Sequence, residues 1–391
     1  MTYIAKYHYA EIQASRKIVI FLFLYFISIG TTAAQNNAIL NFTSKEHSIT
    51  SSNLGQDLRL QIYTPPSYSK SSREYPVLYI LDGQRYFLSG VAIQTAMRSP
   101  RAIPEMIVVG IDTHQTVRRT LFGDEKENFT NFLVNEVVPW IDSNYNTNKE
   151  RVIFGWEAAA YFLSELILQK NEIFDGAILT NGGYASKDKV KEFTSDKEVY
   201  LFIANSKKDI YYISSSDAFS EILKQNAPKN LRWKYRLFND EVHESLAHLS
   251  MYKGLKYYYH NYNALVFESI EQYVDLGGLP YLTSYFEKRA ARFGMDKKID
   301  DATKNGLIWL AWKRNNFEYF SFFMEEFKDV LTTQRYASVY WQNRFGQFYL
   351  KHNAYEKAIN YFQSGLNQYP NSRFEKELKE GLTNAKASIL H

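Results

Sequence analysis

One short stretch, RVIFGWEAAAYF (Arg151 to Phe162), places a carboxylate where a strand is expected to turn into a helix. Gly155 and Ala159, two positions before and two after Glu157, are small enough to allow a tight turn that exposes the middle side chain. A carboxylate needs no base to act as a nucleophile, and it would convert an ester into an anhydride. The stretch therefore predicts a reactive position that cannot support ordinary acyl-enzyme chemistry.

Two further stretches carry side chains with chemical potential. His243 lies in NDEVHESL, and Asp209 lies in ANSKKDIYY just after the apolar run VYLFIA. His243 and His248 are five residues apart with acidic residues nearby, but this spacing does not suit one helical face and lacks the His-Glu-x-x-His order. No metal site is predicted, and no cofactor is indicated. Ser164 falls within the helix after Glu157, where a structural or solvent-facing role is favoured.

The elements that must position these residues alternate between strand and helix from about residue 45 to 262. LRLQIYTPP alternates apolar and polar residues and stops at two prolines, as an antiparallel edge strand would. PVLYIL and MIVVGI are continuously apolar, as strands covered on both faces are. A helical stretch follows in NFTNFLVNEVVPWIDSNY, then the strand VIF, the helix 159–168, and the strands GAILT and VYLFIA. The predicted fold class is α/β, with a mostly parallel sheet flanked by helices.

After about residue 265 the sequence reads as helices only. NRFGQFYLKHNAYEKAINYFQSGLNQYP carries small residues, aromatic residues and a final proline at the spacings of one tetratricopeptide repeat. KRNNFEYF (313–320) parallels KHNAYEKA (351–358) and suggests a second, degenerate copy. The alternative is a helical bundle with accidental spacing. We expect this all-α domain, 265–391, to bind or dock rather than to catalyse.

The N-terminus resembles an export signal. Arg16 and Lys17 precede the apolar run 18–29, and small residues allow cleavage after Ala34. We therefore expect a signal peptide over 1–34, a first domain over 35–264, a periplasmic or secreted location, and no membrane span in the mature form. An uncleaved anchor, or a start codon placed too early, are the alternatives. Cysteine is absent, which excludes disulfides and thiol chemistry, and no basic stripe indicates nucleic acid.

Four stretches together resemble the esterase D family of α/β hydrolases, which includes enterochelin esterases, S-formylglutathione hydrolases and feruloyl esterases. They are IYTPPSYSKSSREYPVLYILDGQRYF, IVVGIDTHQTVRR, FTNFLVNEVVPWIDSNYNTNKERVIFGWEAAA and FNDEVHESLAHLSMYKGLKYYY, and the resemblance covers about residues 48–259. The helical tail also resembles that of some exported bacterial members.

The resemblance implies roles for particular residues. Glu157 stands at the position of the serine nucleophile, His243 corresponds to the general base, and Trp156 crowds the pocket. Asp209 is the candidate for the acid that orients the histidine, although it could equally be a turn residue. The oxyanion hole is expected from the backbone N–H of Ala158 and from the loop around Gly83 and Gln84, and the Glu157 carboxylate would fill it or repel an oxyanion.

Three functions remain open from these residues. The first is a member that has lost the standard mechanism at Glu157 and acts in binding or scaffolding. The second is an active hydrolase that uses Glu157 and His243 by a non-serine mechanism on an acyl ester of a sugar, siderophore or phenolic. The third places the function in the helical tail, which would recruit a protein partner. The sequence does not indicate the oligomeric state.

Overall fold

The computed structural model describes residues 44–70, 72–98, 102–114, 117–209 and 215–390. The expected signal peptide, 1–34, lies outside the described residues. The chain forms two compact units, one built from residues up to 96 and from 105–254, the other from 97–104 and from 255 onward. From the change to a wholly helical sequence we predict that the first domain ends at residue 264 and the second begins at residue 265. These two domain limits stay a prediction.

The first unit is built on one sheet of eight strands in the order β1-β2-β4-β3-β5-β6-β7-β8. The strands are β1 (Ser44–Ser51), β2 (Gln56–Tyr63), β3 (Tyr75–Leu81), β4 (Ile107–Ile111), β5 (Thr147–Trp156), β6 (Gly176–Thr180), β7 (Val199–Ser206) and β8 (Leu231–Phe238). Strands β3 to β8 are parallel, whereas β1 and β2 are antiparallel to their neighbours. The α/β fold class is thereby confirmed.

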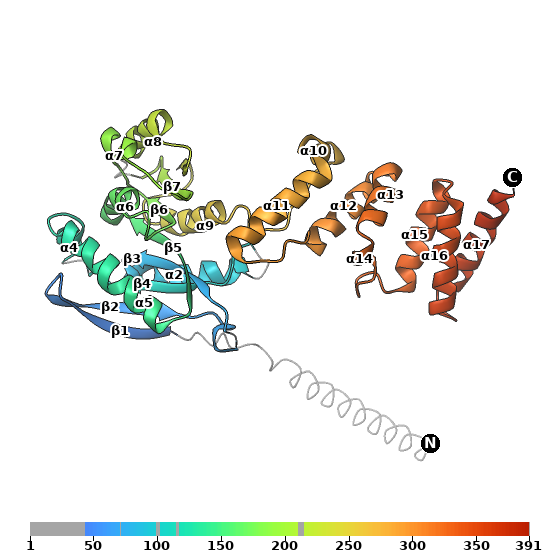
Figure 1. The fold of residues 1–391 in the computed structure, drawn as a ribbon, viewed down its shortest axis with the longest axis horizontal. Coiled ribbons are helices and arrows are strands. Elements are labelled where there is room, and N and C mark those ends of the chain that lie inside the picture. The colour runs from blue at the N-terminus through green and yellow to red at the C-terminus, as the bar shows by residue number, and fades with distance from the viewer. Residues whose placement is uncertain (1–43, 71, 99–101, 115–116, 210–214, 391) are drawn as a thin grey trace, which may run out of the picture. The chain divides into compact units, whose positions relative to one another are not determined.

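Helices cover both faces of this sheet (Figure 1). They are α2 (Gly83–Arg98), α3 (Arg118–Phe122), α4 (Lys126–Asn131), the π-helical segment η2 (Phe132–Val137), α5 (Val138–Asn144), α6 (Ala158–Gln169), α7 (Lys187–Lys191), α8 (Ser215–Asn226) and α9 (Leu246–Tyr258). A short 3-10 turn, η1 (Tyr68–Lys70), precedes β3. The central strands are wholly buried, as their continuous apolar runs predict.

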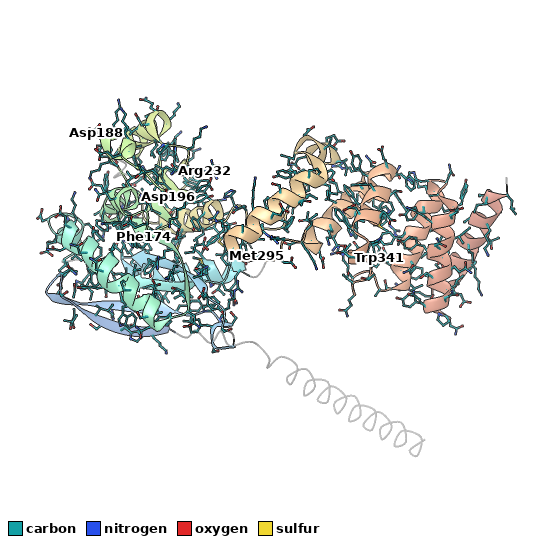
Figure 2. The ribbon with its side chains drawn as sticks, viewed as in Figure 1. Phe174, Asp188, Asp196, Arg232, Met295 and Trp341 are labelled. Carbon is teal, nitrogen blue, oxygen red and sulfur yellow. The ribbon has the colours of Figure 1, made fainter. Side chains whose placement is uncertain are left out.

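Alternate residues of the strands serve the two layers. Tyr79 and its same-face neighbours belong to the core under α3 to α8. Phe174, which is labelled in Figure 2, packs edge-on against Tyr79 with ring centroids 5.8 Å apart. On the opposite face, α2 and α9 approach closely through glycine. A Cβ on Gly90 would lie 2.2 Å from Ile80, and one on Gly254 would lie 2.7 Å from Ile178. Because successive side chains of a strand point to opposite faces, each buried strand contributes side chains to the cores on both sides of the sheet.

The expected edge strand LRLQIY is antiparallel but does not lie at the edge. It forms β2, which pairs with β4 on one side and with β1 on the other. The edge is β1, whose sequence SKEHSITS is mostly polar and carries no strand signal. A polar outer strand is how a sheet commonly ends, because its exposed backbone groups do not then attract another chain.

The described part of the second unit is built from helices. They are α10 (Ile270–Asp275), α11 (Gly278–Phe293), α12 (Asp301–Lys313), α13 (Phe317–Glu326), α14 (Lys328–Leu331), α15 (Val339–Lys351), α16 (Tyr355–Gln368) and α17 (Glu375–Ile389). Among them, α15 packs against α16 and α16 against α17. Asn315 and Asn353 take positive φ angles, 54° and 59°, in the turns after α12 and α15. These two asparagines occupy matching positions of the two similar sequence segments. The assignment to tetratricopeptide repeats stays a prediction.

Phe362 of α16 is held between two glycines of the neighbouring helices. A Cβ on Gly346 of α15 would lie 2.5 Å from the Phe362 ring, and one on Gly381 of α17 would also lie 2.5 Å from it. Such distances leave no room for a methyl group, so glycine sets the spacing of these three helices. None of the described helices is long and apolar enough to cross a membrane.

We predict that Gly346→Ala destabilises the helical unit by about 1–3 kcal/mol, because the added methyl must displace a fully buried ring. Gly306→Ala is the matched control, since a Cβ on Gly306, in α12, would have no atom within 4 Å. Alanine there should stabilise by about 0.5–1 kcal/mol through helix propensity. Urea unfolding of the full chain, followed by circular dichroism at the helical band, measures both. Equal stability of the two variants would contradict the packing argument.

Candidate active site

Six polar residues meet at the carboxyl ends of the parallel strands. They are Asp82 after β3, Arg118 after β4, Glu157 after β5, Asn181 after β6, Asp209 after β7 and His243 after β8. The chain moves from β3 to β4 on one side and then to β5 on the other. A crevice forms where a parallel sheet reverses its strand order in this way. Asp82, after β3, and Glu157, after β5, stand on the two sides of this crevice.

Glu157 lies on a strained backbone turn between β5 and α6. Its φ and ψ angles are 51° and −117°, a combination that non-glycine residues rarely adopt and that costs about 1–3 kcal/mol. The turn is held by a hydrogen bond from the Glu157 N–H to the Thr180 carbonyl, 2.9 Å long. A Cβ on Gly155 would lie 2.9 Å from the Ala159 backbone, so glycine is needed there. The turn therefore exposes the Glu157 side chain as the sequence predicts.

His243 lies between two carboxylates. Its Nε2 atom is 2.5 Å from Glu157 Oε1, and its Nδ1 atom is 2.8 Å from Asp209 Oδ2. Asn181 donates a further hydrogen bond of 2.6 Å to the same oxygen of Asp209. The imidazole ring is thereby fixed in orientation and has both nitrogens engaged.

Arg118 holds the second oxygen of Glu157. Its Nη1 atom donates to Glu157 Oε2 over 3.2 Å, and its Nη2 atom donates to the Trp156 carbonyl over 2.5 Å. Its Nε atom donates to both oxygens of Asp82, at 2.9 and 3.0 Å. The Asp82 carboxylate is 3% exposed and Arg118 is 13% exposed, so this is a largely buried ion pair. Arg118 thus bridges the ends of β3 and β5.

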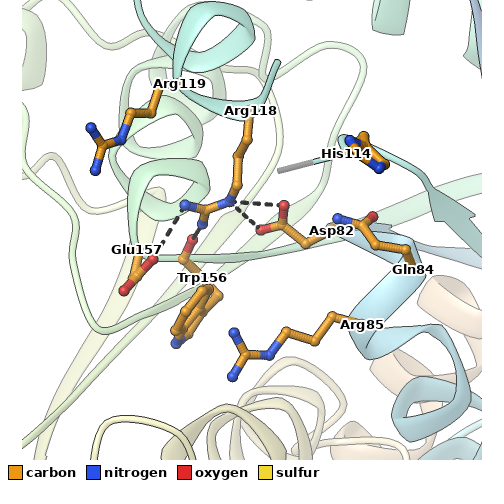
Figure 3. Close-up of a pocket in the computed structure, with 8 residues that line it drawn as sticks. All are labelled: Asp82, Gln84, Arg85, His114, Arg118, Arg119, Trp156 and Glu157. Atoms are coloured by element: carbon orange, nitrogen blue, oxygen red, sulfur yellow. Dashed lines mark hydrogen bonds and ion pairs between the residues drawn. The ribbon is translucent and has the colours of Figure 1, made fainter. Parts of the chain in front are cut away.

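These groups line a cavity of about 590 Å³ (Figure 3). The residues that line it are Asp82, Gln84, Arg85, His114, Arg118, Arg119, Trp156 and Glu157. The Arg85 guanidinium lies over the Trp156 ring at 4.3 Å, and Tyr86 meets the same indole edge-on at 5.8 Å. Burial raises the pKa of Tyr86 above its usual range, which keeps its phenol neutral. The wall around Glu157 is therefore aromatic and cationic.

The sequence model of the family described as "Putative esterase" matches residues 51–273, more than half of the chain. The chain belongs to the Putative esterase family. Among curated proteins, the uncharacterised protein YbbA of Bacillus subtilis (strain 168) is 26% identical over 105 residues, which are 24% of this chain and 42% of that protein. The chain thus matches less than half of the length of this relative.

Solved structures resemble the chain in fold, including the following two. An IroE-like serine hydrolase from Shewanella oneidensis has 20% identity and a TM-score of 0.54, covering 72% of this chain and 98% of its own. An uncharacterised protein from Capnocytophaga ochracea DSM 7271 has 16% identity and a TM-score of 0.57, covering 88% of this chain and 100% of its own. At such identities they show a shared esterase-like α/β fold.

The structure brings Glu157, His243 and Asp209 of this family member together, with Trp156 beside them in the cavity. Asp209 is buried and bonded to the histidine rather than serving only a turn. Ser164 is buried in α6, where it donates to the Ala160 carbonyl and accepts from the Tyr184 N–H. Among the described residues, no group of three or more His, Asp or Glu is placed to hold a metal.

The oxyanion donors expected from Ala158, Gly83 and Gln84 stay a prediction. Gln84 lines the cavity, and its side chain accepts from the Thr113 N–H over 3.2 Å. The expectation that the Glu157 carboxylate fills the hole does not match its contacts within the described part of the chain. Its two oxygens bond to the His243 and Arg118 side chains instead of to backbone N–H groups.

Sequence reasoning missed Asp82, Arg118 and Asn181 as site residues. Each follows a strand that the sequence identified from its apolar run, in the stretches LDGQ, GIDTHQTVRR and GAILTN. The available signal was this position, because the carboxyl ends of neighbouring parallel strands meet at one edge of the sheet. For Arg118 there was a second signal, because its positive charge makes it a suitable ion-pair partner for Glu157.

We predict that Arg118→Met lowers the free energy of unfolding by about 3–5 kcal/mol, because it leaves the buried Asp82 carboxylate without its cation. Arg119→Met is the matched control on the same helix, since Arg119 is exposed, and its effect should stay within about 0.5 kcal/mol. Urea unfolding measures both variants. The double variant Asp82→Asn, Arg118→Met should recover part of the loss, and no recovery would contradict the ion-pair explanation.

Proposed function

We propose that the chain is a non-hydrolytic member of its esterase family that binds a carboxylic ester or the corresponding acid in the cavity beside Glu157. The observation that carries this proposal is the engagement of both Glu157 oxygens, one by His243 and the other by Arg118. A residue held on both sides by cation or N–H donors is suited to a fixed structural role. The cavity remains open next to it and offers Trp156 and cationic side chains to a ligand.

Serine-type acyl transfer is not available to this arrangement. In that mechanism the histidine takes a proton from the nucleophile's hydroxyl and later delivers it to the leaving group. Glu157 has no hydroxyl, and the Nε2 atom of His243, which would accept the proton, already faces the Glu157 carboxylate at 2.5 Å. In this arrangement both ring nitrogens of His243 face carboxylates, and neither is directed at a substrate.

A second candidate is a hydrolase that uses Glu157 as a carboxylate nucleophile. The alignment of Glu157, His243 and Asp209 favours it, because α/β hydrolases that attack carbon with an aspartate use the same three positions. The contacts of Glu157 argue against it, since each hydrogen bond to a carboxylate oxygen draws charge from the lone pairs that would attack. A glutamate also places its oxygen about one methylene further along than an aspartate does, and errors near 1 Å are costly.

The family resemblance suggests an acyl ester of a sugar, a siderophore or a phenolic acid as the ligand. Arg85 and Arg119 line the cavity, and among the described residues neither has a carboxylate within ion-pair distance. A ligand with a carboxylate or an acidic phenol would find its charge matched there. Export to the periplasm or the medium, supported by the apolar run 18–29 and its basic flank, would place the protein where such esters occur.

We predict that the purified protein hydrolyses p-nitrophenyl acetate no faster than the Glu157→Ala variant does. Glu157→Ser should instead gain turnover of at least about tenfold over that baseline, because it supplies a hydroxyl beside an oriented histidine. Release of p-nitrophenol at neutral pH measures all three proteins.

If the turnover gained by Glu157→Ser comes from serine-type catalysis, it must depend on His243. Adding His243→Ala to Glu157→Ser should return the rate to the baseline, with circular dichroism used to verify folding of each variant. Wild-type turnover well above that of Glu157→Ala would show that the protein is an esterase after all and would overturn the proposal.

The second candidate makes a different expectation for mass spectrometry. A carboxylate nucleophile would attack the carbon of 1-bromobutane, break its carbon–bromine bond, release bromide and form a butyl ester on Glu157. His243→Ala should trap this ester by slowing its hydrolysis. We expect no adduct on Glu157 in either protein, with Glu157→Gln as the background control. An adduct confined to the peptide that contains Glu157 would establish that Glu157 acts as a nucleophile, and it would rule out a purely binding role.

A further inference from the structure

A second cavity lies wholly within the helical unit, on helices α12 and α15. It has a volume of about 500 Å³, and its lining residues are Trp309, Trp312, Lys313, Asn315, Tyr340, Arg344, Phe348 and Lys351. Trp309, Trp312 and Lys313 of α12 are three and one positions apart, so they lie on one face of that helix. The four lining residues of α15 are four, four and three positions apart and likewise share one face. We call this surface the tryptophan groove.

The tryptophan groove is rich in positive charge. Lys313, Arg344 and Lys351 line it, and none of its lining residues is acidic. In the described part of the chain, none of the three has a carboxylate within ion-pair distance. Lys351 bonds only to the amide oxygen of Asn315, over 2.7 Å. Lys313 and Lys351 hold matching positions in the two similar sequence segments, each at the end of its helix.

The aromatic rings of the groove use their faces on one another and on these cations. Trp309 packs edge-to-face with Trp312 at 5.2 Å, and both do so with Trp341, which is labelled in Figure 2. The Arg344 guanidinium lies over Trp312 at 4.9 Å, and the Lys313 ammonium lies over Trp309 at 5.4 Å. A sugar ring needs a free aromatic face on which to stack. What the groove presents instead is a set of N–H donors above an apolar floor.

We propose that the tryptophan groove binds an acidic peptide segment of a partner protein, with carboxylates on Arg344, Lys313 and Lys351 and an apolar side chain against the ring edges. Cations that already lie over aromatic rings lose little freedom when they bind a carboxylate, so they are prepared for it. The charge of the groove selects acidic segments, and its aromatic floor selects those that also carry an apolar residue. This inference is independent of the function proposed for the cavity beside Glu157.

The test uses two synthetic peptides and the full chain. The first is acetyl-Asp-Glu-Phe-Asp-Glu-amide, and the second is its uncharged isostere, acetyl-Asn-Gln-Phe-Asn-Gln-amide. Isothermal titration and tryptophan fluorescence should show that the acidic peptide binds at least about tenfold more tightly, with an affinity that falls as NaCl is raised. Equal affinity of the two peptides, or no binding of either, would overturn the proposal.

Two variants locate the site. Arg344→Gln and Lys351→Gln should each weaken binding of the acidic peptide by about fivefold to tenfold. Arg373→Gln is the matched control, because Arg373 is exposed in the same unit and also lies over an aromatic ring, at 4.8 Å from Phe374, but outside the groove. An equal loss in the control would place the binding elsewhere and would overturn the assignment to this groove. Tighter binding of an oligogalacturonate than of the acidic peptide would identify an anionic glycan as the ligand and would also overturn the proposal.

Discussion

The site depends on one interaction, the pairing of each Glu157 oxygen with a separate partner. A carboxylate on an exposed, strained turn would repel the buried Asp209 and Asp82 nearby unless hydrogen-bond donors were placed between them. His243 fills the space toward Asp209, and Arg118 fills the space toward Asp82. The result is an alternating row of three carboxylates and two cationic or donor groups across the ends of the central strands.

This row explains why the local structure tolerates its strain. The backbone at Glu157 and at Asp82 takes positive φ angles of 51° and 55°, and such positions persist only where their surroundings fix them. Each of these two side chains contributes to a network that ties neighbouring strand ends together through Arg118. The turn at Glu157 thus places a carboxylate within this network.

Much of this arrangement could be predicted from the sequence, and the reasons for the rest are physical. The buried strands were recognisable from their continuous apolar runs, and Glu157, His243 and Asp209 could be located because they follow strands in a known order. The polar strand β1 could not be recognised, since its pairing with β2 alone makes it a strand. Arg118 was missed because its role depends on which strand ends lie side by side, and that is set by the crossing of β3 to β4 and back to β5.

Basic side chains of this chain are held in two ways. In the esterase unit Arg118 is paired with carboxylates of the same chain, so its charge is neutralised within the fold. In the helical unit Arg344 and Lys313 lie over tryptophan rings, which attract a cation without cancelling its charge. Charge held in this second way remains available to an external carboxylate. Arg85 over Trp156 in the esterase unit is held in this second way too, so each unit keeps a cationic surface that suits an acidic ligand.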